Sequence, residues 1–202
     1  MHYYKDNFLP EELFSTFSKE ATVQYEPREG WYKLDSHAYG RGLSGEDYQT
    51  VAPTRIVGTP YPEKDNFCMS AVQMKSKSLP EVVYSIKKYM IEELKFINPE
   101  ARMVWFQYHS NKSKVISHID NPLAGKPIEQ AFTSLLYVHD TWEDAWGGEV
   151  CFIDGDSILP KPNRLVIYRR DVEHWVNEIM HNQDGYPRTL LFTGWATDND
   201  IQ

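Results

Sequence analysis

The stretch Ile116-Ser117-His118-Ile119-Asp120-Asn121-Pro122, near the middle of the chain, places a histidine and an aspartate two positions apart. Side chains alternate between the two faces of a β-strand, so a strand here would point His118 and Asp120 to the same side. An imidazole and a carboxylate on one face provide two of the ligands that a divalent metal ion needs. The spacing alone is a weak signal, because 7 histidines and 29 acidic residues allow a chance match.

A third ligand has to come from elsewhere, and His174 is the candidate. Two histidines and one carboxylate on one face of an octahedron form the facial triad that binds non-haem Fe(II) and leaves positions open. The alternative is that His174 is a core histidine bonded to a backbone carbonyl. His139 is excluded as a ligand, because its neighbour Asp140 would point to the opposite face of a strand. The histidines without usable spacing are predicted to be surface or loop residues: His37, His109 and His181.

Composition indicates an ordinary globular chain of one domain, residues 1–202. Of its 202 residues, 41% are hydrophobic and 25% are charged, and no apolar run is long enough to span a membrane. The first residues lack the apolar core of a signal peptide. Cys68 and Cys151 follow no metal or disulfide spacing, which predicts core residues in a reducing compartment and hence a cytoplasmic protein. The net charge of −8 argues against a nucleic-acid partner.

The first half of the chain is predicted to be helical support and a long loop. A short helix is expected over 10–17, and a second one begins at a capping box formed by Ser78 and Glu81 and ends at Asn98. Residues 26–66 mix Gly, Pro, Tyr and Asp without a lasting period. A stretch of that kind is either a lid over a site or a plain surface loop.

The second half reads as short strands separated by turns, which predicts a mainly β jelly-roll, or double-stranded β-helix, over 101–197. Helices and loop in residues 1–100 would support one sheet. The expected strands cover 103–108, 114–118, 132–139, 149–153, 165–169, 174–179 and 188–196.

Taken in order, these features resemble the 2-oxoglutarate/Fe(II) oxygenases, and within them the prolyl hydroxylases of the oxygen-sensing type. The resemblance covers about half of the chain, from Met103 to Ala196. The matching features are Tyr108 ten residues before His118, the stretch His118–Pro122, the stretch Leu135–Trp142, Gly147-Gly148, Asn163–Val166, His174-Trp175-Val176, and a strand that begins at Arg188 and includes Trp195.

The resemblance implies Fe(II) bound by His118, Asp120 and His174, with 2-oxoglutarate as cosubstrate, O2, and ascorbate as a further candidate reductant. It places Arg188 where the family has the basic residue that binds the far carboxylate of 2-oxoglutarate. The gap of fourteen residues after His174 is wider than usual in this branch, which leaves the facing of Arg188 open. The other pocket residues that it implies are Tyr137, Tyr108, Leu135, Val176 and, in preference to Phe192, Thr193.

Each of these residues has a plainer interpretation. Arg188 could be a surface charge after Pro187, and both tyrosines could be core aromatics with a buried hydroxyl partner. Trp142 and the 26–66 loop are candidate substrate contacts. Arg169 and Arg170 would either meet an acidic substrate or be solvated.

The resemblance implies hydroxylation of an unactivated C–H bond, with release of succinate and CO2. Asp120 fills the position that halogenating relatives leave small, which favours hydroxylation. Gly194 stands where nucleobase demethylases carry a further arginine, which argues against a nucleic-acid substrate.

The expected substrate is a prolyl residue of a peptide or protein. The alternatives are a free amino acid or small metabolite, and a jelly-roll that binds a ligand without turnover. Oligomeric state stays open.

Overall fold

The computed structural model of the chain describes residues 1–25, 32–34, 69–72, 76–109, 114–120, 122–123, 125–180 and 188–198. Most of the predicted 26–66 loop lies outside the described residues, apart from 32–34, which form a strand. Whether that segment is a lid therefore stays a prediction. Cys68, His37 and His181 also lie outside the described part of the chain.

The described elements follow one another as two N-terminal helices among strands, then strands with short 3-10 turns. In chain order they are β1 (His2–Lys5), α1 (Glu11–Tyr25), β2 (Tyr32–Leu34), β3 (Met69–Val72), α4 (Leu79–Glu92), β4 (Glu100–His109), β5 (Val115–His118), η2 (Ile128–Gln130), β6 (Ala131–Tyr137), η3 (Asp144–Trp146), β7 (Val150–Phe152), β8 (Ser157–Ile158), β9 (Leu165–Arg169), β10 (His174–Val176) and β11 (Arg188–Ala196).

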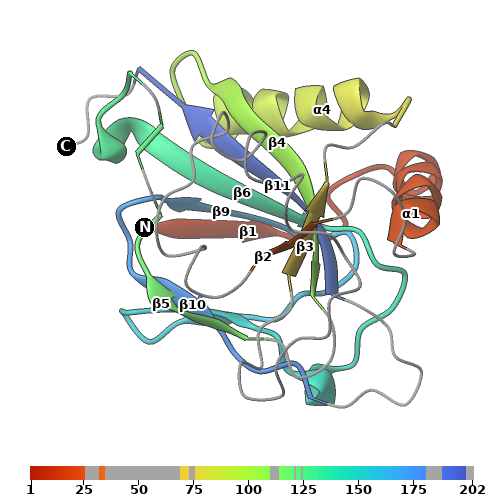
Figure 1. Cartoon of the computed structure of the whole chain (residues 1–202). Coiled ribbons are helices and arrows are strands. Elements are labelled where there is room, and N and C mark those ends of the chain that lie inside the picture. Colours follow the sequence, from red (N-terminus) through yellow and green to blue (C-terminus); the bar gives the residue numbers. More distant parts are fainter. Residues whose placement is uncertain are drawn as a thin grey trace.

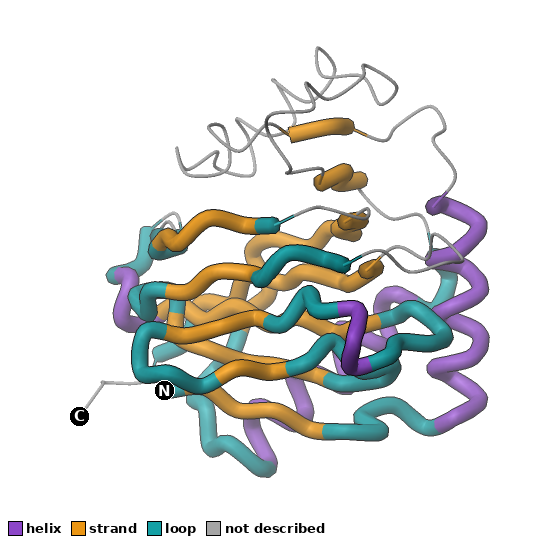
Figure 2. Tube along the Cα trace, turned by 90° about the horizontal axis from the view of Figure 1, so that it is seen from below, coloured by secondary structure: helices purple, strands orange, loops and turns teal. Residues whose placement is uncertain are grey.

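The strands form two antiparallel sheets. The larger has seven strands in the order β1-β9-β6-β11-β4-β3-β2, and the smaller has four in the order β5-β10-β7-β8. Figure 1 shows α4 along the large sheet and the small sheet on the side away from that helix. Turned by 90°, the strands run across the molecule with helical turns at its margins (Figure 2). This is the predicted mainly β jelly-roll architecture with N-terminal supporting helices.

Two hydrophobic clusters follow from the alternation of side chains along each strand. On β11, Leu191 and Trp195 belong to a core that also holds Phe17 of α1 and Ile86 of α4. The neighbouring Leu190 and Phe192 belong to a second cluster, together with residues of β6, β7, β8 and β9. One face of the large sheet therefore packs on the helices, and the other faces the small sheet.

The structure corrects two details of the predicted helix. Ser78 makes no side-chain capping hydrogen bond at the start of α4. Ser76 Oγ instead accepts hydrogen bonds from the backbone N–H groups of Ser78 and Leu79, at 3.1 and 3.0 Å. The helix ends at Glu92, before the expected Asn98. None of the helices in the described residues is long and apolar enough to cross a membrane.

Candidate metal centre

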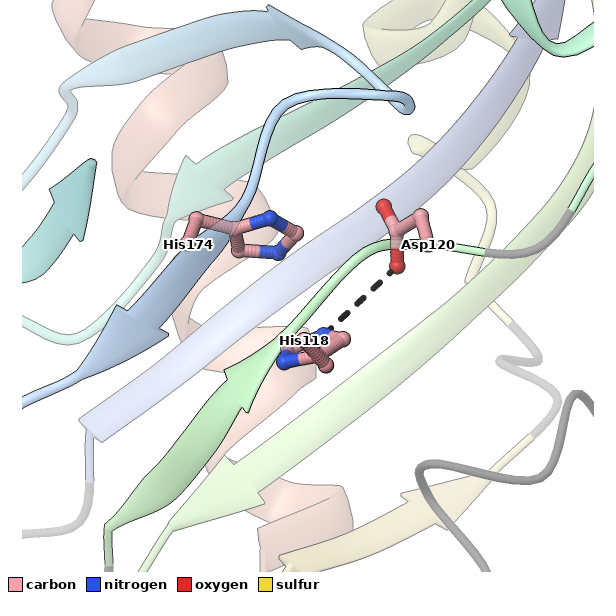
Figure 3. A group of neighbouring side chains, drawn as sticks. All are labelled: His118, Asp120 and His174. Atoms are coloured by element: carbon pink, nitrogen blue, oxygen red, sulfur yellow. Dashed lines mark ion pairs between the residues drawn. The ribbon is translucent and has the colours of Figure 1, made fainter. Parts of the chain in front are cut away.

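His118, Asp120 and His174 meet because β5 and β10 pair antiparallel with His118 directly opposite His174. Figure 3 shows the three side chains turned toward one another, with Asp120 just beyond the end of β5. The two imidazole centroids lie 4.3 Å apart, and His118 Nε2 lies 3.8 Å from Asp120 Oδ1. One ligand atom from each residue lies within 4.8 Å of the others. These two nitrogens and one carboxylate oxygen could hold one divalent ion.

The Asp120 carboxylate is fixed by two side chains at its oxygen Oδ2, Thr133 and Arg170. Its Oδ2 accepts a hydrogen bond of 2.6 Å from the Thr133 hydroxyl on β6. The Arg170 guanidinium donates to the same hydroxyl at 2.9 Å and lies 3.6 Å from Asp120 Oδ2. The backbone adds a third link, because Asp120 N–H donates to the Arg170 carbonyl at 3.1 Å. With Oδ2 held in this way, Oδ1 is the oxygen that faces His118.

The charges around Asp120 keep it ionised. Burial by itself raises the pKa of this carboxyl group. The positive charge of Arg170, followed by interactions with His174 and His118 and the Thr133 hydrogen bond, outweighs burial, so that the pKa lies below its usual value. A metal ligand has to be deprotonated, and Asp120 is therefore in its metal-binding form at neutral pH.

The imidazole of His174 is likewise oriented for metal binding, through a hydrogen bond made by its nitrogen Nδ1. Nδ1 lies 2.9 Å from the Val172 carbonyl, to which it can only donate, and Nε2 is left as the lone-pair nitrogen. The Tyr168 hydroxyl lies 3.1 Å from Nε2. Burial is the main cause that lowers the pKa of His174, and it outweighs the opposing Asp120 charge. The neutral imidazole is the form that ligates a metal, so the donor set fits Fe(II).

A narrow cavity between the sheets connects the two histidines to Arg188. Arg188 is 1% exposed, and its Nη2 donates a 3.0 Å hydrogen bond to the Tyr137 hydroxyl. It occupies the same face of β11 as Leu190 and Phe192, which is the inner face. The Arg188 side chain therefore points toward the cavity, which the sequence had left open. The cavity is lined by Gln107, His109, Val115, His118, Leu135, Val150, Tyr168, His174, Val176, Arg188 and Leu190.

Thr193 is a correction. The predicted pocket included it, but strand alternation puts Thr193 on the face of β11 that carries Leu191 and Trp195, toward the helices. It does not line the cavity between the sheets. Tyr108 lies on β4, but its side chain is outside the described part of the chain. Its role in the pocket stays a prediction.

The arginines and the tryptophan expected to contact substrate have other partners. Arg170 is 3% exposed and pairs with Asp120, so neither of its two alternatives, contact with an acidic substrate or solvation, fits the structure. Arg169 pairs with Asp171. Trp142 is buried against Trp146, with its indole N–H donating to the Gly147 carbonyl at 3.0 Å.

Sequence reasoning missed six residues that line the cavity, and three of them are polar: Gln107, His109 and Tyr168. His109, predicted to be a surface or loop residue, is 1% exposed, and burial followed by the Arg188 charge holds its pKa well below the usual value. Strand alternation along β4 could have indicated Gln107 and His109 together. His139, excluded as a ligand, is buried with Nε2 2.5 Å from the Pro160 carbonyl.

Comparison with known proteins finds a family model that is similar to this part of the chain. Residues 103–197 match the 2OG-Fe(II) oxygenase superfamily. No curated protein matches the chain in sequence.

Several solved structures share the fold. A prolyl-4-hydroxylase from Pseudomonas putida is 14% identical, with a TM-score of 0.59 over 98% of this chain and 92% of that one. A prolyl hydroxylase from Trichoplax adhaerens, in complex with a hypoxia inducible factor peptide fragment, is 14% identical with a TM-score of 0.63 over 98% and 83% of the two chains. The alpha-ketoglutarate-dependent epimerase SnoN from nogalamycin biosynthesis is 11% identical, with a TM-score of 0.61 over 96% and 76%.

The matched segment contains all three converging side chains and Arg188, and the fold is shared with prolyl hydroxylases. Residues 103–197, just under half of the chain, are therefore similar in sequence to the 2OG-Fe(II) oxygenase superfamily, and they include the three candidate metal ligands.

Proposed function

We propose that this protein is an Fe(II)- and 2-oxoglutarate-dependent hydroxylase that acts on a prolyl residue of a peptide or protein. The observation that carries the proposal is that two members of the His118, Asp120 and His174 cluster, the histidines, border one cavity together with the buried Arg188. Fe(II), with 2-oxoglutarate and O2, would supply the oxidation of an unactivated C–H bond, releasing succinate and CO2.

The side chains of the protein would provide binding, orientation and a dry pocket. His118, Asp120 and His174 would bind the metal from one side and leave its other side open. Arg188 and Tyr137 would bind the far carboxylate of 2-oxoglutarate, because a guanidinium offers a planar pair of donors that matches a carboxylate. The apolar side chains of Leu135 and Val176 would exclude water from the same cavity.

The choice of a prolyl substrate rests on the order of the sequence features and on the two prolyl hydroxylases that share the fold. The shared fold with an epimerase means that fold alone does not fix the reaction. A free amino acid or small metabolite is therefore the rival substrate class. Ascorbate, as a reductant that keeps the iron in its ferrous state, belongs to the same proposal.

A substrate panel tests the proposal. Purified protein with Fe(II), 2-oxoglutarate and ascorbate is incubated with proline-containing peptides, with free proline and with other free amino acids. We expect succinate in step with a peptide product heavier by one oxygen atom, located on proline by fragmentation. The His118→Ala protein serves as the inactive control. Oxygen incorporation into a free amino acid but no peptide would contradict the prolyl-peptide assignment.

Arg188 has its own test. Arg188→Ala should weaken 2-oxoglutarate binding by about 2 to 5 kcal/mol, because a buried charge pair loses one partner. Arg188→Lys should restore only part, since an ammonium is a point charge without the guanidinium fork. Titration of the metal-loaded, oxygen-free protein by calorimetry measures both. Equal affinity in the wild-type and Arg188→Ala proteins would mean that another cation binds the cosubstrate.

A further inference from the structure

Gln107 is a buried polar residue of the cavity to which neither the sequence features nor the family resemblance gives a role. It lies on β4, is 2% exposed, and lines the same cavity as His118, His174 and Arg188. Its amide nitrogen Nε2 has no hydrogen-bond partner within the described part of the chain. Buried donors are nearly always satisfied in folded proteins, so this nitrogen points to a ligand.

The amide of Gln107 is oriented by its neighbour on the same face of β4. His109 Nε2 lies 3.4 Å from Gln107 Oε1. An amide oxygen can only accept, so His109 is the donor in this contact. The amide oxygen of Gln107 therefore accepts from His109, and the two N–H groups of Nε2 are available to a ligand in the cavity.

Strand register places Gln107 opposite the tyrosine that would bind cosubstrate. Leu190 of β11 pairs with Gln107 of β4 on one side and with Tyr137 of β6 on the other. Arg188 pairs with His109. Because these residues share the inner face, Gln107 and Tyr137 flank the same position of β11, and His109, which contacts the Gln107 amide, lies at the level of Arg188.

Arg188 contributes a further donor at that level. Its Nη2 is bonded to Tyr137, but its Nε has no hydrogen-bond partner among the residues that the structure describes. An ionised carboxylate has about four lone-pair positions, more than Tyr137 and Nη2 alone can fill. Gln107 Nε2 and Arg188 Nε supply donors for the remaining ones.

We propose that Gln107, oriented by His109, is a further binding residue for the far carboxylate of 2-oxoglutarate. This inference rests on the proposed function and adds to it a donor on β4, on the opposite side of β11 from Tyr137. Gln107 would act together with Arg188, so that the carboxylate is bound from three strands.

The test compares two ligands that differ only at the far end. Calorimetry on the full chain, loaded with Mn(II) and kept free of oxygen, measures binding of 2-oxoglutarate and of 2-oxopentanoate, in which a methyl group replaces the far carboxylate. Gln107→Leu should weaken 2-oxoglutarate binding by about tenfold to a hundredfold, the usual effect of losing a hydrogen bond to a charged group. Binding of 2-oxopentanoate and of Mn(II) should be unchanged.

Two further variants separate binding from packing. Gln107→Glu keeps an oxygen for His109 but brings a negative charge toward the ligand, and should weaken 2-oxoglutarate binding more than Gln107→Leu does. Gln130→Leu makes the same chemical change on η2, where the side chain is half-buried and does not line the cavity, and should match the wild type. If Gln107→Leu fails to fold, Gln107→Met, which keeps the length of the side chain, replaces it.

The outcomes are distinct. Unchanged affinity for 2-oxoglutarate in Gln107→Leu would overturn this inference and leave the proposed function standing. An equal loss for both ligands would also overturn it, since Gln107 would then support the fold or the metal end of the ligand. A wild-type protein that binds Mn(II) but not 2-oxoglutarate would overturn the proposed function itself, and this inference with it.

Discussion

Asp120 shows at the scale of a single residue how a buried carboxylate could be prepared for a metal ion. One oxygen is held by Thr133 and Arg170, which would leave the other oxygen for the ion. Gly194 makes room for this arrangement, because a Cβ atom there would lie 3.3 Å from Arg170 Nη1. An arginine from the turn after β9 thus reaches the carboxylate across a position that needs to be small.

Replacing Arg170 tests this support. Arg170→Met should destabilise the fold by about 3 to 5 kcal/mol, because one partner of a buried ion pair is removed. It should also weaken metal binding by about tenfold to a hundredfold, the usual effect of losing an outer partner of a ligand. The matched control is Arg169→Met, because the neighbouring Arg169 is more exposed and pairs with Asp171. Urea unfolding and Mn(II) titration measure the two effects, and equal metal affinity in both variants would contradict the account.

His139 makes the stability of the fold depend on pH. Burial, the largest cause, lowers its pKa from 6.5 to about 4, against the opposing hydrogen bond to the Pro160 carbonyl. The folded state therefore favours the neutral ring. Its contribution, about 3 kcal/mol, is complete above the unfolded pKa and is lost as the pH falls from about 6.5 to 4.

A variant that cannot titrate isolates this effect. His139→Gln keeps a donor for Pro160 but has no proton to gain in this range. Its unfolding free energy, measured in urea between about pH 7 and 4, should fall less steeply than that of the wild type. Parallel curves for the two proteins would show that His139 does not cause the acid sensitivity.

At the scale of an element, the Gly147-Gly148 turn shapes the pocket around Arg188. Gly148 has a φ of +75°, and a Cβ atom there would meet Ile179 at 3.1 Å and both Arg188 Cδ and Trp142 at 3.3 Å. The turn therefore packs directly on the stem of the arginine. Its backbone needs glycine for conformation as well as for space.

Gly148→Ala should shift Arg188 and weaken 2-oxoglutarate binding, with Mn(II) affinity nearly unchanged. Gly155→Ala is a matched control, because Gly155 also has a positive φ, +95°, but a Cβ atom there would meet nothing within 4 Å. Both variants should lose about 1 kcal/mol of stability from backbone strain. Equal 2-oxoglutarate affinity in the two variants would mean that the turn does not position Arg188.

Strands were predictable from sequence because their alternation is local. The strands expected at 165–169 and 188–196 are observed with the same bounds. The role of Arg170 was not predictable, since it lies in a turn, where no period indicates the direction of a side chain. The pairing of β1 with β9 was not predictable either, because it joins residues far apart in the chain and produces no local sequence pattern.

The candidate site was predictable where spacing and strand alternation agree. His118 and Asp120 converge as predicted, although Asp120 lies just past the end of β5, and the register of β10 against β5 brings His174 to them. Thr193 was misplaced by a slip of one residue along β11, which is enough to move a side chain to the other face. Strand alternation could have placed Gln107 on the inner face of β4, but its unsatisfied donor is revealed only by burial in the folded chain.

For the whole molecule, the jelly-roll provides two sheets whose facing sides build one site. The small sheet contributes His118 and His174, and the large sheet contributes Thr133, Tyr168 and Arg188. The proposed metal ligands His118 and His174 and the proposed carboxylate-binding residue Arg188 therefore come from opposite walls of one cavity. Packing of α1 and α4 on the outer face of the large sheet supports this arrangement without contributing to the lining of the cavity.

Metal stoichiometry tests the central claim most directly. Protein loaded with Fe(II) without oxygen and passed through a desalting column should retain one iron per chain in the wild type. The His174→Ala protein, folded by circular dichroism, should retain almost none, because two protein ligands hold the ion too weakly. One iron per chain in folded His174→Ala would contradict the assignment of His118, Asp120 and His174 as the iron site.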